Sequence, residues 1–278
     1  MDFYLPIMPT FLPRKRFGQH FLQDKHVVSQ IIQAIAPSPD YNFVEIGPGK
    51  GALTFELLKH VEHLSIIELD RDLVSELEPQ LASYPHLTLY SADALKFNFL
   101  QLINGQPLHI VGNLPYNIST SLIFHLLNFA SHVGKMTFML QKEVVDRMVA
   151  LPNSKSYGRL SVILQYFFYV QKLFDVPPEA FNPPPKVDSS IVQLTPHTVV
   201  PVQVMDFKVF NQVVSQAFSQ RRKTLRNTLK HWLTAEEMES IDIDPYKRAE
   251  ALNLESFAKL ANLFTQNHIY IERELSPE

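Results

Sequence analysis

Apolar positions follow two different spacings along the first two hundred residues of the chain. Short runs of β-branched and aromatic residues alternate with stretches in which apolar residues recur at the helical period, as they do from Val27 to Ile35. Alternation of strands and helices predicts a mostly parallel sheet that is covered by helices on both faces. The runs predict strands over residues 43–46, 64–69, 87–90, 109–111, 136–140 and 160–168, and the periodic stretches predict helices over residues 27–35, 52–61 and 122–127.

The C-terminal part of the chain has a different pattern. All eight glycines precede residue 159, and seven of the twenty prolines lie between residues 177 and 201, where they predict loops around one strand at residues 190–194. From residue 207 onward, apolar stripes recur only at helical spacing, which predicts a small helical bundle. We therefore expect two domains, an α/β domain over residues 1–200 and an all-helical domain over residues 201–278.

Composition narrows the class of protein. The chain has 278 residues, of which 46% are hydrophobic, so it can bury a sizeable core and is not a disordered chain. It contains no cysteine, which excludes disulfides, thiolate metal sites and a cysteine nucleophile. A chain without cysteine fits a reducing compartment, and we expect a cytoplasmic protein. No stretch reaches about 18 uninterrupted apolar residues, so we expect no membrane-spanning helix.

Three glycines stand close together directly after the first predicted strand. Gly47, Gly49 and Gly51 precede a predicted helix, where the chain must turn tightly while its backbone approaches a ligand. Glu68, at the end of the second strand, can accept hydrogen bonds from both hydroxyls of a ribose. Asp93, after the third strand, can accept from the amine of an adenine, although a helix cap is an equal alternative. This set suits NAD and S-adenosylmethionine alike and leaves the cofactor open.

A second polar cluster follows the strand predicted at residues 109–111. Asn113 and Leu114 offer a side-chain and a backbone oxygen, Pro115 stiffens the turn, and Tyr116 adds an aromatic ring. The exocyclic amine of adenine is a poor nucleophile because its lone pair is delocalised into the ring, and hydrogen-bond acceptors can draw that pair back onto nitrogen. Stacking on Tyr116 would offset the cost of removing a base from its own stack. These four residues are the candidate catalytic residues.

Eight sequence blocks, spread over nearly the whole chain, have the content and order of one known family. They include Glu-Ile-Gly-Pro-Gly-Lys-Gly at residues 45–51 and Gly-Asn-Leu-Pro-Tyr-Asn at residues 112–117. On these blocks the chain resembles the KsgA/RsmA family of small-subunit (16S) rRNA adenine N6,N6-dimethyltransferases. The blocks cover residues 14–22, 44–51, 67–70, 112–120, 139–144, 157–160, 181–189 and 220–223.

The resemblance implies a Rossmann-like class I methyltransferase sheet, S-adenosyl-L-methionine as methyl donor and no metal. It also implies dimethylation of two adjacent adenosines in the hairpin loop near the 3′ end of 16S rRNA, in the 30S subunit or its precursor, during small-subunit biogenesis. Phe181 is implied as a second aromatic near the target base, with a core position as the alternative. Carried over by position, the donor-contacting residues are His20, Leu22, Glu45, Gly47, Glu68, Asp93 and Asn113. Family members carry either Asn or His at the position of His20, which leaves open which of its atoms contacts the donor.

Positive charge is concentrated in one segment, although the formal net charge of −3 gives no general argument for binding nucleic acid. Residues 206–230 hold six basic and one acidic side chain, whereas residues 231–278 hold four basic and ten acidic ones. We expect the basic side chains to lie on a helix that packs on one face and meets RNA phosphates with the other. A merely solvated helix face is the alternative. The side chains are Arg221, Arg222, Lys223, Arg226 and Lys230, with a second cluster at residues 14–16.

Three other functions fit parts of this pattern. A methyltransferase of the Erm type, acting on large-subunit rRNA, would share the donor site and the base-binding loop. A dehydrogenase would use the glycine turn for NAD, and a non-catalytic assembly factor would bind nascent subunits without modifying them. The oligomeric state is not determined by the sequence, and a monomer is the default expectation.

Overall fold

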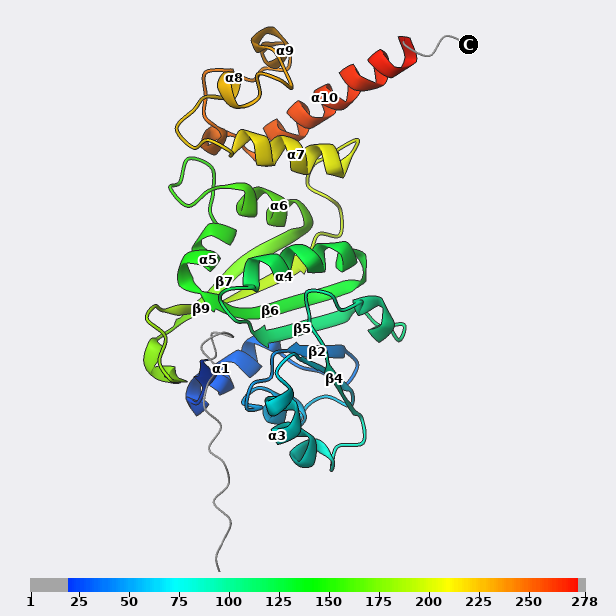
Figure 1. Ribbon diagram of the computed structural model, residues 1–278, viewed down its shortest axis with the longest axis vertical. Helices are drawn as coiled ribbons and strands as arrows, with labels where there is room; N and C mark the ends of the chain where they lie inside the picture. The colour runs from blue at the N-terminus through cyan, green and yellow to red at the C-terminus, as the bar shows by residue number, and fades with distance from the viewer. Residues whose placement is uncertain (1–19, 275–278) are drawn as a thin grey trace, which may run out of the picture. The chain divides into compact units, whose positions relative to one another are not determined.

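The computed structural model describes residues 20–274 of the chain, and side chains up to residue 267 (Figure 1). The basic cluster at residues 14–16 lies outside the described residues. Backbone contacts divide the chain into two compact units. The first consists of Met1–Phe129, Thr137–Gln141 and Asp175–Ile191, and the second of Ala130–Met136, Lys142–Phe174 and Val192–Glu278. The domain boundary that we place near residue 200 stays a prediction.

Seven strands form one sheet. β2 pairs in parallel with both β3 and β5, and β3 pairs in parallel with β4. A mostly parallel sheet flanked by helices confirms the predicted α/β class. In their order across the sheet, the strands are β4 (Leu87–Ser91), β3 (Leu64–Glu68), β2 (Asn42–Ile46), β5 (Leu108–Asn113), β6 (Val133–Gln141), β9 (Ser189–Pro196) and β7 (Phe168–Val176).

Helices connect the strands of the first unit. The side chain of Asp24 accepts hydrogen bonds from the backbone N–H groups of His26 and Val27, and so begins the first helix at the residue that follows it. The apolar face predicted between Val27 and Ile35 is buried. The helices are α1 (Lys25–Ile35), α2 (Thr54–Leu57), which is shorter than predicted, α3 (Arg71–Leu81) and α4 (Ser119–Leu126), with 3₁₀ helices η2 (Phe99–Leu102) and η4 (Pro178–Ala180).

A two-stranded antiparallel sheet joins distant segments of the first unit. β1 (Phe21–Leu22) pairs with β8 (Phe181–Asn182), and Leu22 stands opposite Phe181. The backbone N–H groups of Gln23 and Asp24 also donate to the carbonyl of Ala180. The segment around residue 181 is thereby held beside the residues that lead into α1.

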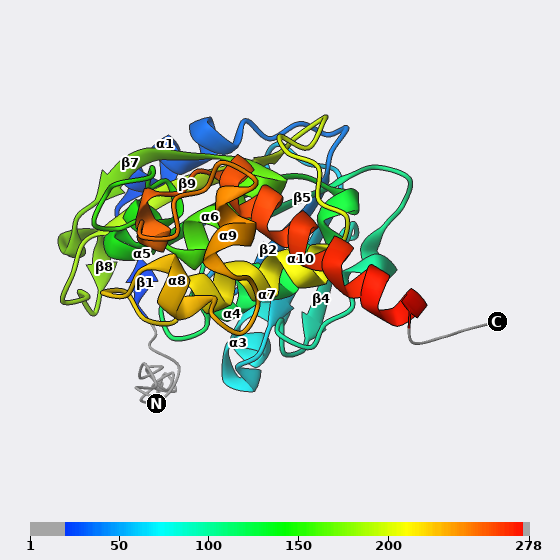
Figure 2. The same ribbon diagram turned by 90° about the horizontal axis from the view of Figure 1, so that it is seen from above.

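The second unit is mainly helical, as predicted for residues beyond 207. α10 lies beside α7 (Figures 1 and 2). The ring of Phe218, just after α7, contacts the ring of Phe257 on α10, with their centroids 5.6 Å apart. None of the helices that the structure describes is long and apolar enough to cross a membrane. The helices are α5 (Lys142–Met148), α6 (Arg159–Phe167), α7 (Phe207–Ala217), α8 (Leu225–Thr228), α9 (Ala235–Glu239) and α10 (Leu254–Glu274), with 3₁₀ helices η3 (Leu127–His132), which begins in the first unit, and η5 (Ala249–Ala251).

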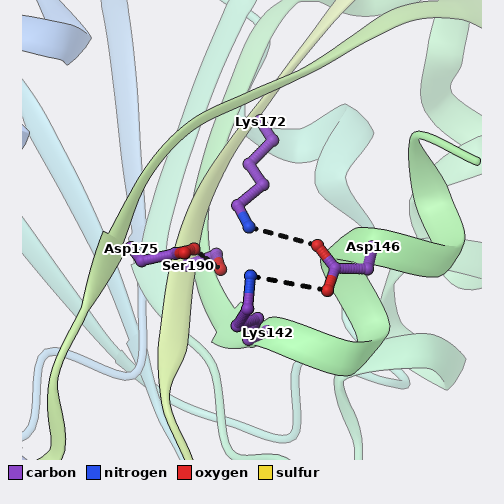
Figure 3. A network of polar contacts seen from close by, with 5 residues as sticks. All are labelled: Lys142, Asp146, Lys172, Asp175 and Ser190. Atoms are coloured by element: carbon purple, nitrogen blue, oxygen red, sulfur yellow. Dashed lines mark hydrogen bonds and ion pairs between the residues drawn. The ribbon is translucent and has the colours of Figure 1, made fainter.

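A small charge network connects two elements of the second unit. Asp146 on α5 forms ion pairs with Lys142, one turn earlier, and with Lys172 on β7, at N–O distances of 3.6 and 3.1 Å (Figure 3). Partly exposed pairs of this kind contribute at most about 1 kcal/mol each to the free energy of unfolding. The network therefore orients α5 against β7 more than it stabilises the unit.

The strand predicted at residues 160–168 is wrong. Those residues form α6, and the strand β7 begins only at Phe168. Leu160, Val162 and Ile163 are all nearly fully buried, so this helix is apolar on most of its circumference. An apolar run without a polar face cannot be distinguished from a buried strand by its periodicity.

The single helix expected for the basic segment is also wrong. Among residues 218–230, only Leu225–Thr228 is α-helical, and Arg221, Arg222 and Lys223 lie in the turns that precede it. The backbone N–H groups of Leu225 and Arg226 donate to the carbonyls of Lys247 and Pro245. These tertiary hydrogen bonds hold the segment in a compact turn where the sequence pattern favours a longer helix.

Gly112 on β5 provides a test of how tightly the sheet is packed. A Cβ at this position would lie 2.4 Å from the carbonyl oxygen of Ile46, a backbone atom that cannot move away as a flexible side chain could. We expect Gly112→Ala to lower the free energy of unfolding by about 1–3 kcal/mol or more, measured by urea denaturation. The control is Gly158→Ala, where a Cβ would meet no heavy atom within 4 Å and the loss should be less than about 1 kcal/mol, the usual cost of alanine at a helix N-cap. Equal effects of the two substitutions would contradict this account.

Candidate active site

The register of three parallel strands places the predicted site residues in one row. Ile46 is paired with Ile67 on β3, and Glu45 with Val111 on β5. Continuing both registers along the chain puts Gly47, just after β2, level with Glu68 at the end of β3 and with Asn113 at the end of β5. Since the carboxyl ends of parallel strands meet at one edge of a sheet, these three residues lie together at that edge.

The chain after β2 turns in a conformation that favours glycine. Gly47 and Gly49 have φ values of 68° and 59°, in the left-handed region that residues with a Cβ rarely adopt. The backbone N–H of Gly47 donates to the carbonyl of Ile67 at 2.9 Å, which keeps the start of the turn against β3. A Cβ at Gly49 would come within 3.1 Å of the Phe21 ring. The turn therefore needs glycine for its conformation and for its packing.

One cavity of the first unit is lined by most of the predicted site residues. It reaches from the glycine turn to the loop at residues 113–116, so both predicted ends of the site open into the same space. Over the described residues, no group of three or more His, Asp or Glu side chains is arranged to hold a metal ion. The predicted residues that line the cavity are His20, Leu22, Glu45, Gly47, Glu68, Asp93, Asn113, Leu114, Pro115 and Tyr116.

Two buried carboxyl groups give the cavity its electrostatic character. Glu45 and Glu68 are only 1% and 7% exposed. Burial raises the pKa of Glu45 to about 7, against the opposing effect of a 2.7 Å hydrogen bond from the Thr54 hydroxyl, and the charge of Glu68 raises it further. Burial also raises the pKa of Glu68, although the backbone N–H of Asp70 donates to its Oε1 at 2.8 Å. A cation in this cavity would favour the ionised form of both groups.

Asp93 lies in a turn after β4. No helix begins there, so the alternative that Asp93 caps a helix is wrong. Its Oδ1 accepts a hydrogen bond from the backbone N–H of Leu95 at 3.0 Å. The side chain is half-buried and lines the cavity. Its second carboxylate oxygen can therefore serve as an acceptor for a bound group.

The loop after β5 is anchored at its first two residues. The Nδ2 atom of Asn113 donates to the carbonyl of His20 at 3.1 Å, and the backbone N–H of Leu114 donates to the carbonyl of Met139 at 3.2 Å. Because a carbonyl can only accept, the first bond fixes which end of the Asn113 amide faces His20 and leaves Oδ1 as an available acceptor. The adjoining turn at Pro115 is closed by hydrogen bonds to its carbonyl from Ile118 and Ser119.

His20 contacts the same loop with its ring. The ring stacks on that of Tyr116 with centroids 5.8 Å apart, and its Nδ1 is 2.8 Å from the carbonyl oxygen of Pro183. Nδ1 must therefore carry the proton in this contact, which makes Nε2 the ring nitrogen that remains available to a ligand.

Four further predicted residues do not line this cavity. Phe181 is 4% exposed and lies in β8, opposite Leu22. Arg221 belongs to the second unit, where it donates to the carbonyl of Lys155 and forms an ion pair with Glu250 at 3.6 Å. Arg222 and Lys223 are exposed in the same turn.

Two site residues were missed by the sequence analysis. Thr54 hydrogen-bonds Glu45 from α2, and Ser189 hydrogen-bonds the Tyr116 hydroxyl at 2.7 Å from the start of β9. Thr54 gives no signal in the sequence, because a threonine in a helix has many possible roles. Ser189 closes the block at residues 181–189, but only the folded chain shows that it reaches Tyr116, 73 positions earlier.

Comparison with known proteins places this geometry in a family. The family model described as "Ribosomal RNA adenine dimethylase" matches residues 10–266. The chain belongs to this family. It is 53% identical over 250 residues to "Ribosomal RNA small subunit methyltransferase A" from Hahella chejuensis, covering 90% of this chain and 92% of that protein. It is 49% identical over 258 residues to the protein of the same name from Escherichia coli strain 55989, covering 92% and 94% of the two chains.

Solved structures agree with this placement. A dimethyladenosine transferase from Plasmodium falciparum superposes with a TM-score of 0.76 at 28% identity, covering 90% of this chain and 98% of that one. The 23S rRNA methyltransferase ErmE superposes with a TM-score of 0.69 at 23% identity, covering 88% and 100%, and shows a shared fold. As a member of the ribosomal RNA adenine dimethylase family, the chain is a methyltransferase with a Rossmann-like fold. The dehydrogenase alternative is thereby set aside.

The raised pKa of Glu45 predicts a pH dependence of stability. Its pKa rises from 4.5 to about 7 on folding, so its protonated form is the one that the fold favours. This contribution is fully present below pH 4.5 and is lost as the pH rises through 7, by about 3 kcal/mol in total. We expect Glu45→Gln, which stays neutral, to unfold in urea with a smaller loss of stability between pH 5 and pH 8 than the natural chain shows.

The control for removing a carboxylate is Glu56→Gln on α2. Glu56 pairs with Lys59 at the surface, and its side chain is 40% exposed. An unchanged pH dependence in Glu45→Gln, or an equal flattening in both variants, would show that Glu45 is not the buried group responsible.

Proposed function

We propose that this enzyme transfers methyl groups from S-adenosyl-L-methionine to the N6 atoms of two adjacent adenosines in the hairpin loop near the 3′ end of 16S rRNA. The substrate would be the 30S subunit or its precursor, and the reaction would belong to small-subunit biogenesis. One observation carries the proposal: the glycine turn with Glu68, and the loop at residues 113–116, line the same cavity. The names of the most similar relatives support a small-subunit rRNA as the substrate.

The cavity residues fit a donor of this chemistry. S-adenosyl-L-methionine carries positive charge on its sulfonium and its ammonium group, and the buried carboxyls of Glu45 and Glu68 would be compensated by it. The backbone N–H of Asp70 donates to Oε1 of Glu68 and orients this carboxylate, which would accept ribose hydroxyls. The remaining contacts expected from the family resemblance come from His20, Leu22, Gly47, Asp93 and Asn113, all of which line the cavity.

The chain's own groups would make the adenine amine reactive. When bound, the sulfonium donor supplies an electrophilic methyl group on a good leaving group. Oδ1 of Asn113 and the carbonyl of Leu114 would accept hydrogen bonds from the amine and draw its lone pair onto nitrogen. Tyr116 would stack on the base and hold it in line with the donor. This division of work needs positioning and hydrogen bonding only, and no covalent nucleophile from the chain.

Asn113 provides the test of catalysis. We expect Asn113→Ala to reduce the rate of methyl transfer to 30S particles from cells lacking this protein by about 10²–10³, the usual cost of losing one positioned group in a transition state. Transfer is measured with labelled donor, and the modified nucleosides are identified by mass spectrometry. The control Asn128→Ala removes the same atoms from an exposed position in the 3₁₀ helix η3, and should keep the full rate.

Three results would contradict the proposal. A natural chain that methylates large-subunit rRNA and not 30S particles would point to the Erm type of activity. An Asn113→Ala variant that keeps the full rate of methyl transfer would show that Asn113 is not the catalytic acceptor. A natural chain that transfers no methyl group but still promotes subunit maturation would favour a role as a non-catalytic assembly factor. Thermal stabilisation by S-adenosylhomocysteine but not by NAD tests the donor class independently.

The exposed basic turn of the second unit is proposed to meet RNA phosphates. Arg222 and Lys223 are better placed for this than Arg221, which is engaged with Lys155 and Glu250. We expect replacement of both by glutamine to reduce the slope of log affinity for 30S particles against log salt by about 2, one for each lost phosphate contact. An unchanged slope would assign these side chains to a merely solvated surface. The comparison variant Lys208→Gln with Lys259→Gln removes two charges from α7 and α10.

A further inference from the structure

Tyr116 is held by two side chains that lie far from it in the sequence. Its ring stacks on the ring of His20, with planes 28° apart, and its hydroxyl is 2.7 Å from the hydroxyl of Ser189. All three residues belong to the first unit. One side of the Tyr116 ring is therefore next to His20, and the polar end of the ring is tied to the start of β9.

Ser189 is well suited to hold the hydroxyl of Tyr116. Its side chain is fully buried, and a buried hydroxyl needs a hydrogen-bond partner. It stands on a strand of the sheet, whose backbone ladder fixes the position of its Cα more firmly than a loop would. Burial raises the pKa of Tyr116, and the hydrogen bond to Ser189 acts in the opposite direction. The two hydroxyls thus form a pair with a fixed position inside the site.

We propose that Ser189 is a positioning residue for methyl transfer, which holds the Tyr116 ring in the orientation that stacks on the extruded adenine. The inference rests on the proposed function, because it takes Tyr116 as the base-stacking residue. The bond at the hydroxyl fixes where the far end of the Tyr116 ring lies, and so restrains the torsion about Cα–Cβ. The hydroxyl lies on the axis of the second torsion, so the stacked ring of His20 is the contact that restrains rotation of the ring about that axis. A ring whose far end is free to move would hold the adenine less accurately against Asn113, and a misplacement of about 1 Å can lower a rate by about 100-fold.

The next residue of β9 offers a matched control. Successive residues of a strand point to opposite faces of the sheet, so Ser190 points away from the face on which Ser189 meets Tyr116. The hydroxyl of Ser190 is 2.5 Å from Oδ1 of Asp175 (Figure 3). Ser190 is also fully buried. Ser190→Ala therefore removes the same atom, from the same strand and at the same burial, without touching the base-binding loop.

The test is a double-mutant cycle between Ser189→Ala and Tyr116→Phe. We measure single-turnover methylation of 30S particles at saturating donor, together with binding of S-adenosylhomocysteine. Each single variant should lower the rate by about tenfold, and the double variant should lose no more than either alone, because both remove one and the same hydrogen bond. Binding of S-adenosylhomocysteine should stay within about twofold of the natural chain, and Ser190→Ala should keep the full rate.

Several outcomes would overturn this inference. A full rate in Ser189→Ala or in Tyr116→Phe would show that the bond does not matter for transfer. Losses that multiply in the double variant would show that Ser189 acts by some route other than the Tyr116 hydroxyl. If Ser189→Ala fails to fold, Tyr116→Phe still removes the bond from its other end and decides the question. If the natural chain does not methylate 30S particles, the proposed function fails first and the inference fails with it.

Discussion

The site depends on the parallel register of β2, β3 and β5. That register aligns the carboxyl ends of the three strands, so that Gly47, Glu68 and Asn113 meet in one row at a single edge of the sheet. The close packing of β5 against β2 leaves no room for a side chain at Gly112, since a Cβ there would meet the Ile46 carbonyl at 2.4 Å. A shift of one strand along another would separate the donor side of the cavity from the loop that would receive the base. The backbone ladder, and not any one side chain, therefore brings the two sides together.

At the same edge of the sheet, two buried carboxyl groups are unfavourable in their charged form, and a cationic ligand can compensate them. Burial raises the pKa of Glu45 to about 7 and raises that of Glu68 as well, so the surroundings of the two carboxyls disfavour the negative charges that a cationic donor would stabilise. Thr54 keeps Glu45 oriented through a 2.7 Å hydrogen bond. The charged carboxylates lower the stability of the folded chain, and a bound ligand of opposite charge would stabilise them. Functional sites often combine burial and charge in this way.

The loop at residues 113–116 is held in place by segments that lie elsewhere in the chain. His20 contributes a carbonyl to Asn113 and a ring to Tyr116, and Ser189 contributes a hydroxyl to Tyr116. His20 is itself held by the carbonyl of Pro183, and β1 pairs with β8 next to it. The loop is thus braced by the start of the described chain and by the segment between β7 and β9. These contacts explain why one short turn can hold a hydrogen-bond acceptor and an aromatic ring in fixed positions.

Sequence alone determined the elements whose residues show a clear period, and the chemistry of the motifs at their ends. It placed β2 through β6, the buried face of α1 and the cavity residues from Glu45 to Tyr116, because runs of β-branched and aromatic residues, helical periodicity and short motifs are local properties of a chain. It failed at α6, where apolar residues surround the helix, and at the turn before α8, where hydrogen bonds to residues 245 and 247 override helical periodicity. Only the tertiary structure decided that Ser189 reaches Tyr116 and that Thr54 reaches Glu45. Those contacts join residues that are distant or unmarked in the sequence, and they exist only once the sheet has fixed where each strand begins and ends.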